Sequence, residues 1–253
     1  MNKFYNISVT CQKVIKNTLT NIHIRELKTN VERCSMDTNL VNNRIWLEGK
    51  VVAKPRFSHE MFGEGFYNFD MEVMRLSDSK DVLSVTISER IMVGIDFSIG
   101  TEIVVEGQLR SYNKIVDGRN KLILTVFARN ITVCNEKSKN PNEIYLDGYI
   151  CKKPLYRTTP FGREIADVLL AVNRAYNKSD YIPTIAWGRN SRFCKNLQVG
   201  DNIRIWGRLQ SREYQKKVSE NEKITKIAYE VSISKMEKVD KDNVVIETSE
   251  DVC

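Results

Sequence analysis

Short segments of alternating apolar and polar residues, broken by Gly and Pro, run through residues 142–234. Alternation with a period of two is typical of β-strands and not of helices. A short helical segment is expected at residues 189–196. The pattern predicts five strands, at residues 144–150, 164–174, 181–187, 203–212 and 224–234.

Five strands with a short helix between the third and the fourth follow the order of an OB-fold, a small Greek-key barrel. Gly148 and Gly207 interrupt the first and fourth segments. We expect them where a coiled strand bends sharply to close the barrel. The predicted fold class is therefore all-β.

The same pattern occurs earlier in the chain. The segment NRIWLEG at 43–49 matches NEIYLDG at 142–148, and Pro, Phe-Gly and Arg positions follow with the same offset. From Gly100 and Gly200 onward the offset is one residue longer, so a single insertion separates two copies. Such a repeat predicts tandem copies of one unit. We expect two five-stranded OB-fold barrels, each with the short helix.

The repeat also sets the expected domains. The first barrel is placed at residues 42–136 and the second at residues 142–238. Residues 1–41 form an N-terminal extension for which no element is predicted. The tail, 239–253, holds one Lys against five acidic residues and is expected to be disordered.

Composition argues against several classes of protein. The six cysteines form no C-x-x-C pair and there are two histidines, so neither a zinc site, a cofactor nor a disulfide framework is expected. No Asp/Glu/His constellation has the spacing of a metal-dependent nuclease, and we expect no enzyme. No apolar run approaches the roughly 20 residues of a membrane helix. The N-terminus does not resemble a secretion signal, and a cytoplasmic location is expected.

Charge points to a polyanionic partner. The net charge of the chain is +7, and residues 142–238 hold 18 Lys and Arg against 11 Asp and Glu. In that stretch the cations are interleaved with Tyr, Phe and Trp. Cations suit phosphates and flat rings suit unstacked bases, which is the requirement of a single-strand groove.

Several motifs of the second copy occur in a recognisable order. The motifs are Gly148, Pro154, Arg157-Thr-x-Pro-x-Gly162, Leu170-Ala-Val-Asn-Arg174, Asp180-Tyr-Ile-Pro, Ala186-Trp-Gly188, Val199-Gly-Asp201 and Gly207-Arg-Leu-Gln-Ser-Arg212. With them, the second copy resembles a bacterial single-stranded DNA-binding protein; the first copy resembles that family weakly.

The resemblance implies a protein that binds single-stranded DNA with little sequence preference, in replication, recombination or repair. Stacking and phosphate contacts are the known mechanism of this family's OB-folds. Four barrels per assembly are usual in the family, which implies a homodimer here, in the nucleoid. The family's tail recruits repair and replication proteins through a Pro-Phe ending, which this chain lacks.

Five rings are the stacking candidates. Tyr181, Trp187 and Tyr214 match family positions that stack on bases, and Tyr176 lies where the family has another ring in a loop. Tyr181 and Trp187 share one face of the third strand, roughly 20 Å apart. That spacing suits separate stacking positions, although core packing is the alternative for both. The full set is Phe161, Tyr176, Tyr181, Trp187 and Tyr214.

Eight cations are candidates for phosphate contacts. Arg157 and Arg212 stand inside matched motifs; any other single one could equally be solvated surface. Trp206 shares a face with Arg204 and Arg208, and we expect it to lie in a protein interface or against a base. The eight are Arg157, Arg163, Arg174, Arg189, Arg208, Arg212, Lys216 and Lys217.

The first copy lacks most of these rings. Ile87 is matched with Trp187, Val82 or its neighbour with Tyr181, and Lys114 with Tyr214, so a supporting role in phosphate guidance or assembly is expected. Two other functions remain open for the chain, an OB-fold protein-interaction module of the primosome type and a binder of single-stranded RNA. The polar side chains and rings that the copy retains are Lys54, Arg56, Phe62, Phe66, Tyr67, Arg75, Arg110 and Tyr112.

Overall fold

The structure is a computed structural model that describes residues 42–77, 79–116, 118–134, 136–217 and 223–239. All of them belong to one unit, Asn39–Cys253. The expected N-terminal extension and, apart from its first residue, the acidic tail lie outside the described residues.

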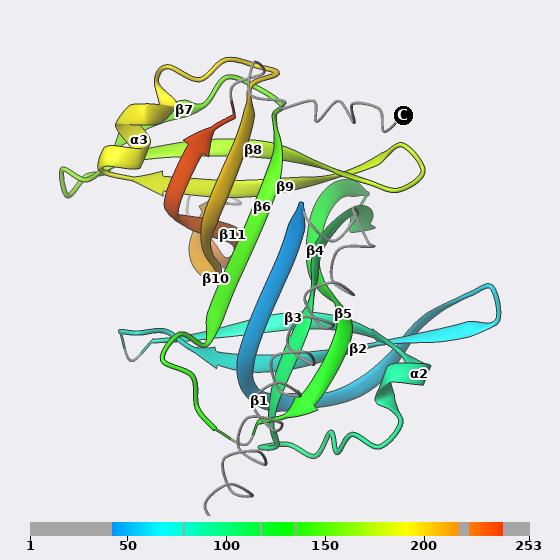
Figure 1. Ribbon diagram of the computed structural model, residues 1–253. Helices are drawn as coiled ribbons and strands as arrows, with labels where there is room; N and C mark the ends of the chain where they lie inside the picture. The colour runs from blue at the N-terminus through cyan, green and yellow to red at the C-terminus, as the bar shows by residue number, and fades with distance from the viewer. Residues whose placement is uncertain (1–41, 78, 117, 135, 218–222, 240–253) are drawn as a thin grey trace, which may run out of the picture. The chain divides into compact units, whose positions relative to one another are not determined.

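The first repeat is a closed barrel. Its strands pair in the order β1–β2–β3–β5–β4 and back to β1, and the β3–β5 contact is parallel. The short helix α2 lies between the third and fourth strands, as predicted (Figure 1). The elements are β1 (Asn43–Met61), β2 (Glu64–Met74), β3 (Lys80–Ser88), α2 (Glu89–Met92), β4 (Glu102–Val116) and β5 (Arg119–Val133).

The second repeat closes in the same order, β6–β8–β9–β11–β10 and back to β6. The prediction of two tandem five-stranded OB-fold barrels is therefore confirmed. A further short strand, β7, was not predicted; it pairs with the edge of β8. The elements are β6 (Asn142–Ile150), β7 (Leu155–Thr158), β8 (Glu164–Arg174), β9 (Lys178–Trp187), α3 (Arg189–Cys194), β10 (Asn202–Lys217) and β11 (Lys223–Lys238).

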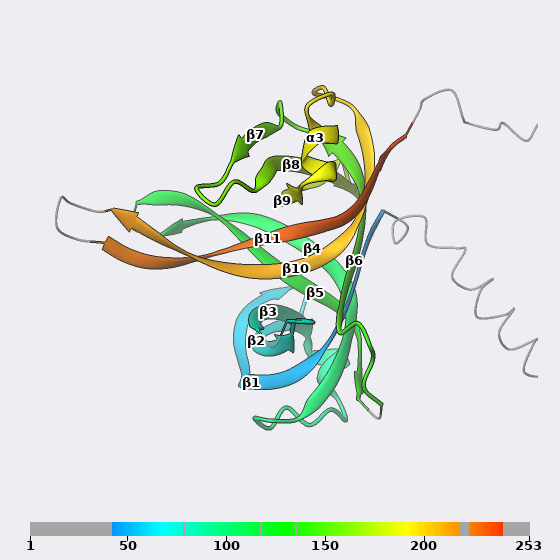
Figure 2. The same cartoon turned by 90° about the vertical axis from the view of Figure 1, so that its left-hand side faces the viewer.

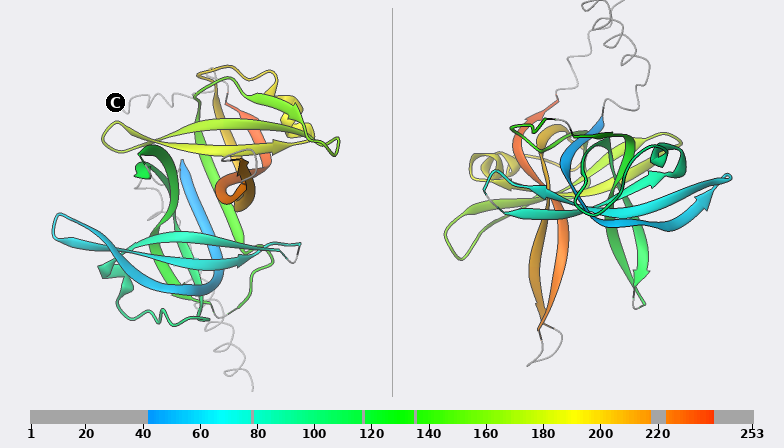
Figure 3. Two further views of the ribbon diagram at one scale, coloured as in Figure 1. Left: turned by 180° about the vertical axis from the view of Figure 1, so that it is seen from behind. Right: turned by 90° about the horizontal axis from the view of Figure 1, so that it is seen from below.

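Strands β10 and β11 extend several residues beyond the predicted segments. Their pairing continues from Ile203–Lys238 to Lys217–Lys223, past the barrel wall. The extension is polar, so no core-facing period marks it in the sequence. The β4–β5 hairpin forms a second such arm, and both arms project to the same side of the barrels (Figures 2 and 3).

Two glycines lie where the strands close. A Cβ on Gly148 would be 2.5 Å from the carbonyl oxygen of Ala171, at the β6–β8 closure. A Cβ on Gly207 would be 2.1 Å from the carbonyl oxygen of Ser232, beside a register shift in β10. Both glycines therefore permit a close backbone approach, as expected from the sequence.

Replacing Gly148 by Val is expected to lower the free energy of unfolding by about 1–3 kcal/mol, the usual cost of overpacking. Urea denaturation measures the change. Tyr149→Ala removes the neighbouring exposed ring and serves as the control, with an effect within about 0.5 kcal/mol. Equal midpoints for the wild type and Gly148→Val would show that the strands separate easily here.

Strands β1 and β6 join the barrels. They pair antiparallel along Asn43–Leu47, and Ile45 lies opposite Ile144. These two residues occupy the same place in the two repeats, so the repeats are related by an approximate two-fold axis. Figure 1 shows β1 and β6 side by side between the barrels.

Two buried carboxylates reinforce this junction reciprocally. Asp81 in the first barrel accepts the N–H of Ser211 from the second, at 2.7 Å from its Oδ1. Asp180 in the second barrel accepts the N–H of Ser111 from the first, at 2.8 Å. Both aspartates are 0% exposed. Each barrel therefore supplies the hydrogen-bond acceptor for a backbone N–H of the other.

Asp81 is ionised in this setting. Burial alone would raise its pKa, but hydrogen bonds from Arg75 and Ser211 outweigh burial, and the net pKa lies below the usual range. The Arg75 guanidinium donates to both carboxylate oxygens, at 2.6 and 2.7 Å. An ion pair of this kind is costly to break from one side.

Two kinds of feature are absent from the described part of the chain. No helix there is long and apolar enough to cross a membrane. No cluster of three or more His, Cys, Asp or Glu residues there could hold a metal ion.

Candidate nucleic-acid interface

A groove of about 560 Å³ lies between the two arms, against the outward face of β8 and β9. The strand period places Asp167 and Leu169 on this face, because Val168 and Leu170 point into the core. The wall on one side is β7, and the opposite wall is the first barrel's β5. The groove is therefore built by both repeats.

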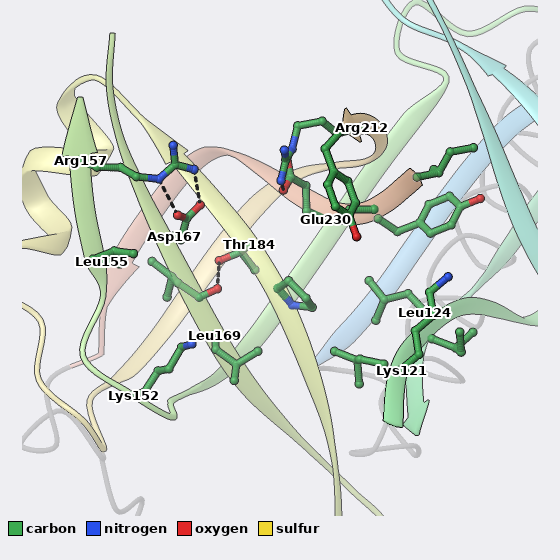
Figure 4. A pocket seen from close by; sticks show the side chains of 18 residues that line it. Lys121, Leu124, Lys152, Leu155, Arg157, Asp167, Leu169, Thr184, Arg212 and Glu230 are labelled. Carbon is green, nitrogen blue, oxygen red and sulfur yellow. Dashed lines mark hydrogen bonds and ion pairs between the residues drawn. The ribbon is translucent and has the colours of Figure 1, made fainter. Parts of the chain in front are cut away.

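Four cations line this groove. Arg157 pairs with Asp167 at 2.9 Å and Arg212 pairs with Glu230 at 3.3 Å. Lys121 and Lys152 complete the set. In Figure 4 Arg157 and Asp167 lie at one end, Lys121 lies at the other, and Arg212 and Glu230 lie between them.

The groove arginines remain available to an anion. The side chains of Arg157 and Arg212 are 45% and 48% exposed. Exposed ion pairs contribute little stability, about 0–1 kcal/mol. A phosphate can therefore displace or share Asp167 at small cost, whereas the buried Glu230 also accepts a hydrogen bond from Gln210.

Tyr214 supplies a ring at the same place. Its side chain lines the groove, and the Arg212 Cζ lies 6.0 Å from its ring centroid. Tyr229 lines the groove nearby, and burial, together with Asp70 and Asp81, raises its pKa. Tyr229 is therefore a neutral phenol at physiological pH. The arrangement combines flat rings with guanidinium groups, the pairing that suits bases and phosphates.

Strand β9 carries two further rings on its outward face. Tyr181 is 49% exposed and Trp187 is 39% exposed. Pro183 lies between them on the same face and lines the groove. Core packing, the alternative for these rings, is wrong, because the core side of β9 carries Ile182 and Ala186.

Tyr176 and Phe161 lie in turns. Tyr176 is 94% exposed and has a positive φ of 62° in the β8–β9 turn. Phe161 is 91% exposed and precedes Gly162 in the β7–β8 turn. Neither lines the groove, so their contact with a strand that leaves it stays a prediction.

The remaining candidate cations are spread over other surfaces. Arg174 lines a cavity of the first barrel, and Arg208 lines a separate hollow. Arg163 and Arg189 are exposed and do not line the groove. The side chains of Lys216 and Lys217 lie outside the described residues. Of the eight, the structure brings Arg157 and Arg212 together.

Sequence reasoning missed residues that line the groove, among them two from each repeat. Lys152 and Leu155 flank the Lys-Pro turn before β7, and that basic turn was a usable signal. Lys121 and Leu124 come from the other repeat. Their place across the groove depends on how the barrels join, which no local pattern indicates.

Trp206 lies away from the groove. Its ring is 5.3 Å from that of Tyr145, and the Lys235 Nζ lies 4.3 Å from its centroid. Together with Trp46 and Arg44 it lines a hollow of about 400 Å³ on the β1–β6–β10 sheet. The position favours the protein interface over base contact, and that assignment stays a prediction.

The structure corrects one match between the repeats. Phe66 pairs with Ser88 in the first barrel, and Ile165 pairs with Trp187 in the second. Ser88, and not Ile87, therefore corresponds to Trp187. Ile87 is a core residue at 0% exposure. The match with Ile87 was wrong because the one-residue insertion comes after β3 and not before it.

Comparison with known proteins is consistent with this geometry. Residues 141–237 match the model of the Single-strand binding protein family. Single-stranded DNA-binding protein 1 of Staphylococcus aureus (strain COL) is 37% identical over 81 residues, which cover 29% of this chain and 48% of that protein. Single-stranded DNA-binding protein A of Bacillus subtilis (strain 168) is 31% identical over 96 residues, covering 35% and 56%. The chain thus spans about half the length of these curated relatives.

A solved structure extends the likeness to both barrels. The wild-type single-stranded DNA binding protein from Thermus aquaticus superposes with a TM-score of 0.63 and 22% identity, covering 79% of this chain and 93% of that one. At this identity the match shows the fold. The match to the family model lies in the second repeat, at residues 141–237.

Proposed function

We propose that this chain binds single-stranded DNA with little sequence preference. The observation that carries the proposal is the groove in which Arg157, Arg212 and Tyr214 lie together, with Trp187 and Tyr181 on the adjoining strand. The names of the relatives, single-stranded DNA-binding proteins, support the same ligand.

In this proposal the rings and the cations contact different parts of the DNA strand. Bases stack on Tyr214, Trp187 and Tyr181, and every base offers a flat face, so sequence preference is small. Phosphates contact Arg157, Arg212 and the groove lysines. The chain acts by binding and not by catalysis, in replication, recombination or repair, within the nucleoid of the cytoplasm.

The exposure of the rings weighs against a pure protein-interaction module. Such a module has no need to align two outward rings on one strand with a cationic groove. Discrimination against RNA depends on contacts to the 2′-hydroxyl, and DNA is proposed here because it is the ligand in the relatives' names.

Fluorescence anisotropy of an end-labelled oligo-dT tests the proposal. We expect saturable binding that weakens with salt, since log K falls with a slope of about −0.7 per neutralised phosphate on single strands. Arg157→Ala is expected to make that slope shallower by about 0.7. Equal competition by duplex DNA, or preferential competition by oligo-rU, would contradict a single-stranded DNA binder.

The β1–β6–β10 sheet face is proposed to bind a second copy of the chain, which gives four barrels per homodimer. Three half-buried rings, Trp46, Tyr145 and Trp206, share this face. Aromatic residues are enriched in interfaces of this kind, which need about 800 Å² on each partner. Replication or repair proteins are proposed as further partners of the assembly.

Trp206→Glu is expected to convert the dimer to a 29.3 kDa monomer, because a charge buried in an interface without a partner is strongly unfavourable. Sedimentation equilibrium measures the mass. Trp206→Phe keeps a ring and is expected to remain dimeric. A wild-type monomer, or a Trp206→Glu dimer, would overturn this part of the proposal.

A further inference from the structure

The first barrel has a cavity of its own, of about 590 Å³, and all of its lining residues except Arg174 lie outside the segment that matches the family. It lies between the end of β1 and the β4–β5 arm, and one residue of the second barrel, Arg174, completes its wall. It is the counterpart of the groove described above, since β4 and β10 hold the same place in the two repeats.

Rings line this cavity. Tyr112 is 46% exposed, and Phe127 is half-buried. The exposed His59 ring stacks on Phe66 with centroids 5.0 Å apart and planes 9° apart. His59 is thereby held as a flat platform at the mouth. None of these rings occupies a position that corresponds to Tyr176, Tyr181, Trp187 or Tyr214.

The guanidinium groups of Arg110 and Arg174 line the same space, and that of Arg129 lies near its Phe127 ring. The Cζ atoms of Arg110 and Arg129 lie 5.8 and 5.9 Å from the Phe127 centroid. Arg110 and Arg174 both approach Asp180, at 3.3 and 3.7 Å. A single carboxylate thus faces two guanidinium groups, with Arg110 at its Oδ2 and Arg174 at its Oδ1, and Oδ1 also accepts the Ser111 N–H.

The cationic charge is therefore incompletely neutralised. The Arg174 Nε is buried and has no hydrogen-bond partner among the described residues. Burial lowers the pKa of Arg110, and the charges of Arg174 and Arg129 act in the same direction. Arginine nevertheless stays protonated in proteins. An incoming anion would relieve the repulsion among these groups.

The floor of the cavity is polar. Thr86 donates to the Asn68 Oδ1 at 2.8 Å, and its hydroxyl lies 2.8 Å from that of Thr125. Hydroxyl and amide groups can donate and accept. They suit the edge of a base that enters between the rings, and they distinguish this cavity from an apolar pocket.

The two repeats place ring and cation in exchanged positions. Tyr112 and Lys114 in β4 correspond to Arg212 and Tyr214 in β10, two residues apart on one strand face. In the parallel strand pairs, Phe127 of β5 lies opposite Thr86 of β3, and Ser232 of β11 lies opposite Ile185 of β9. Phe127 therefore corresponds to Ser232. The first repeat has therefore rearranged its rings and cations and has not lost them.

We propose that this cavity is a second binding site for single-stranded nucleic acid. A base lies against Tyr112, Phe127 and His59, and the adjoining phosphates contact Lys114 and Arg174. The inference rests on the proposed function and adds that the first barrel takes a strand through residues of its own.

Counting short strands bound per full-length chain tests the inference. An oligo-dT of about eight nucleotides falls within the roughly 4–16 nucleotides that one OB-fold covers. Isothermal titration of the wild type is expected to give two strands per chain. His59→Ala with Tyr112→Ala is expected to give one, and so is Trp187→Ala with Tyr214→Ala, because each pair removes two of the three rings of one site.

Two further variants control the count. Phe57→Ala removes an exposed ring of the same strand β1 that contacts Tyr67 and does not line the cavity; it is expected to keep two strands per chain. Lys114→Glu is expected to weaken binding of oligo-dT at the first-barrel site about fivefold or more without removing a ring. It tests the same site if the His59→Ala/Tyr112→Ala variant does not fold.

The outcomes separate the inference from the proposed function. One strand per chain in the wild type, or two in both His59→Ala/Tyr112→Ala and Lys114→Glu with unchanged affinity, would overturn the inference and leave the second-barrel groove intact. Absence of any binding at low salt would overturn the proposed function as well.

Discussion

Asp81→Ala is expected to lower the free energy of unfolding by about 3–5 kcal/mol, the cost of removing one partner of a buried ion pair. The change leaves the Arg75 guanidinium without its carboxylate and the Ser211 N–H without its acceptor. Both donors stay in the junction between the barrels, where water does not easily replace the lost oxygen atoms.

Urea denaturation of the two proteins measures this difference. Asp70→Ala is the matched control: Asp70 pairs with Arg56 at 3.6 Å on the surface of the same barrel, and its loss is expected to cost less than about 1 kcal/mol. Comparable midpoints for Asp81→Ala and Asp70→Ala would mean that the junction does not depend on the buried carboxylate.

The same group gives the junction a pH dependence. The folded-state pKa of Asp81 is lowered, so its stabilising contribution is present above the unfolded pKa of about 3.9 and is lost as the pH falls through the folded pKa. Stability of the wild type should therefore decline below about pH 4. Asp81→Asn should show a smaller decline over that range, and an identical decline would assign the effect to other carboxylates.

In the His59→Ala/Tyr112→Ala background, which lacks the proposed first-barrel site, the double change Trp187→Ala with Tyr214→Ala is expected to weaken binding to oligo-dT by about 100-fold or more. Each stacked base contributes roughly 1–3 kcal/mol, and 1.4 kcal/mol corresponds to a factor of ten. Both side chains are partly exposed, at 39% and 38%, and neither belongs to the core cluster. The fold should therefore survive their removal.

Anisotropy titrations at fixed salt measure the loss of affinity. Phe193→Ala removes a ring of similar exposure from α3, which does not line the groove, and is expected to bind as the wild type does. A loss below about fivefold in the double variant would indicate that phosphate contacts alone hold the strand.

The fold was largely predictable from the sequence because the closure of each barrel requires glycine at fixed strand positions, which can be recognised locally. Gly148 and Gly207 stand where no side chain fits, and the period of two marks each strand. The insertion between the repeats was harder to place. Ile87 and Ser88 differ by one residue, and only strand pairing with Phe66 identifies Ser88 as the counterpart of Trp187.

The residue types of the site were predictable from the sequence, but which of these residues lie together in one groove was less so. The period of two correctly put Tyr181 and Trp187 on one outward face. It carries no information on contacts between the repeats. Lys121 therefore went unnoticed in the second barrel's groove, and Arg174 was assigned to that groove although it lines the first barrel's cavity.

The most direct test of single-strand stacking is the quenching of individual tryptophans on titration with oligo-dT. The chain has three, Trp46, Trp187 and Trp206, of which Trp46 and Trp206 line the opposite hollow. The account predicts quenching that survives in the Trp46→Phe/Trp206→Phe variant and is largely lost in Trp187→Phe. Quenching that persists in Trp187→Phe, or its absence in the wild type at low salt, would contradict it.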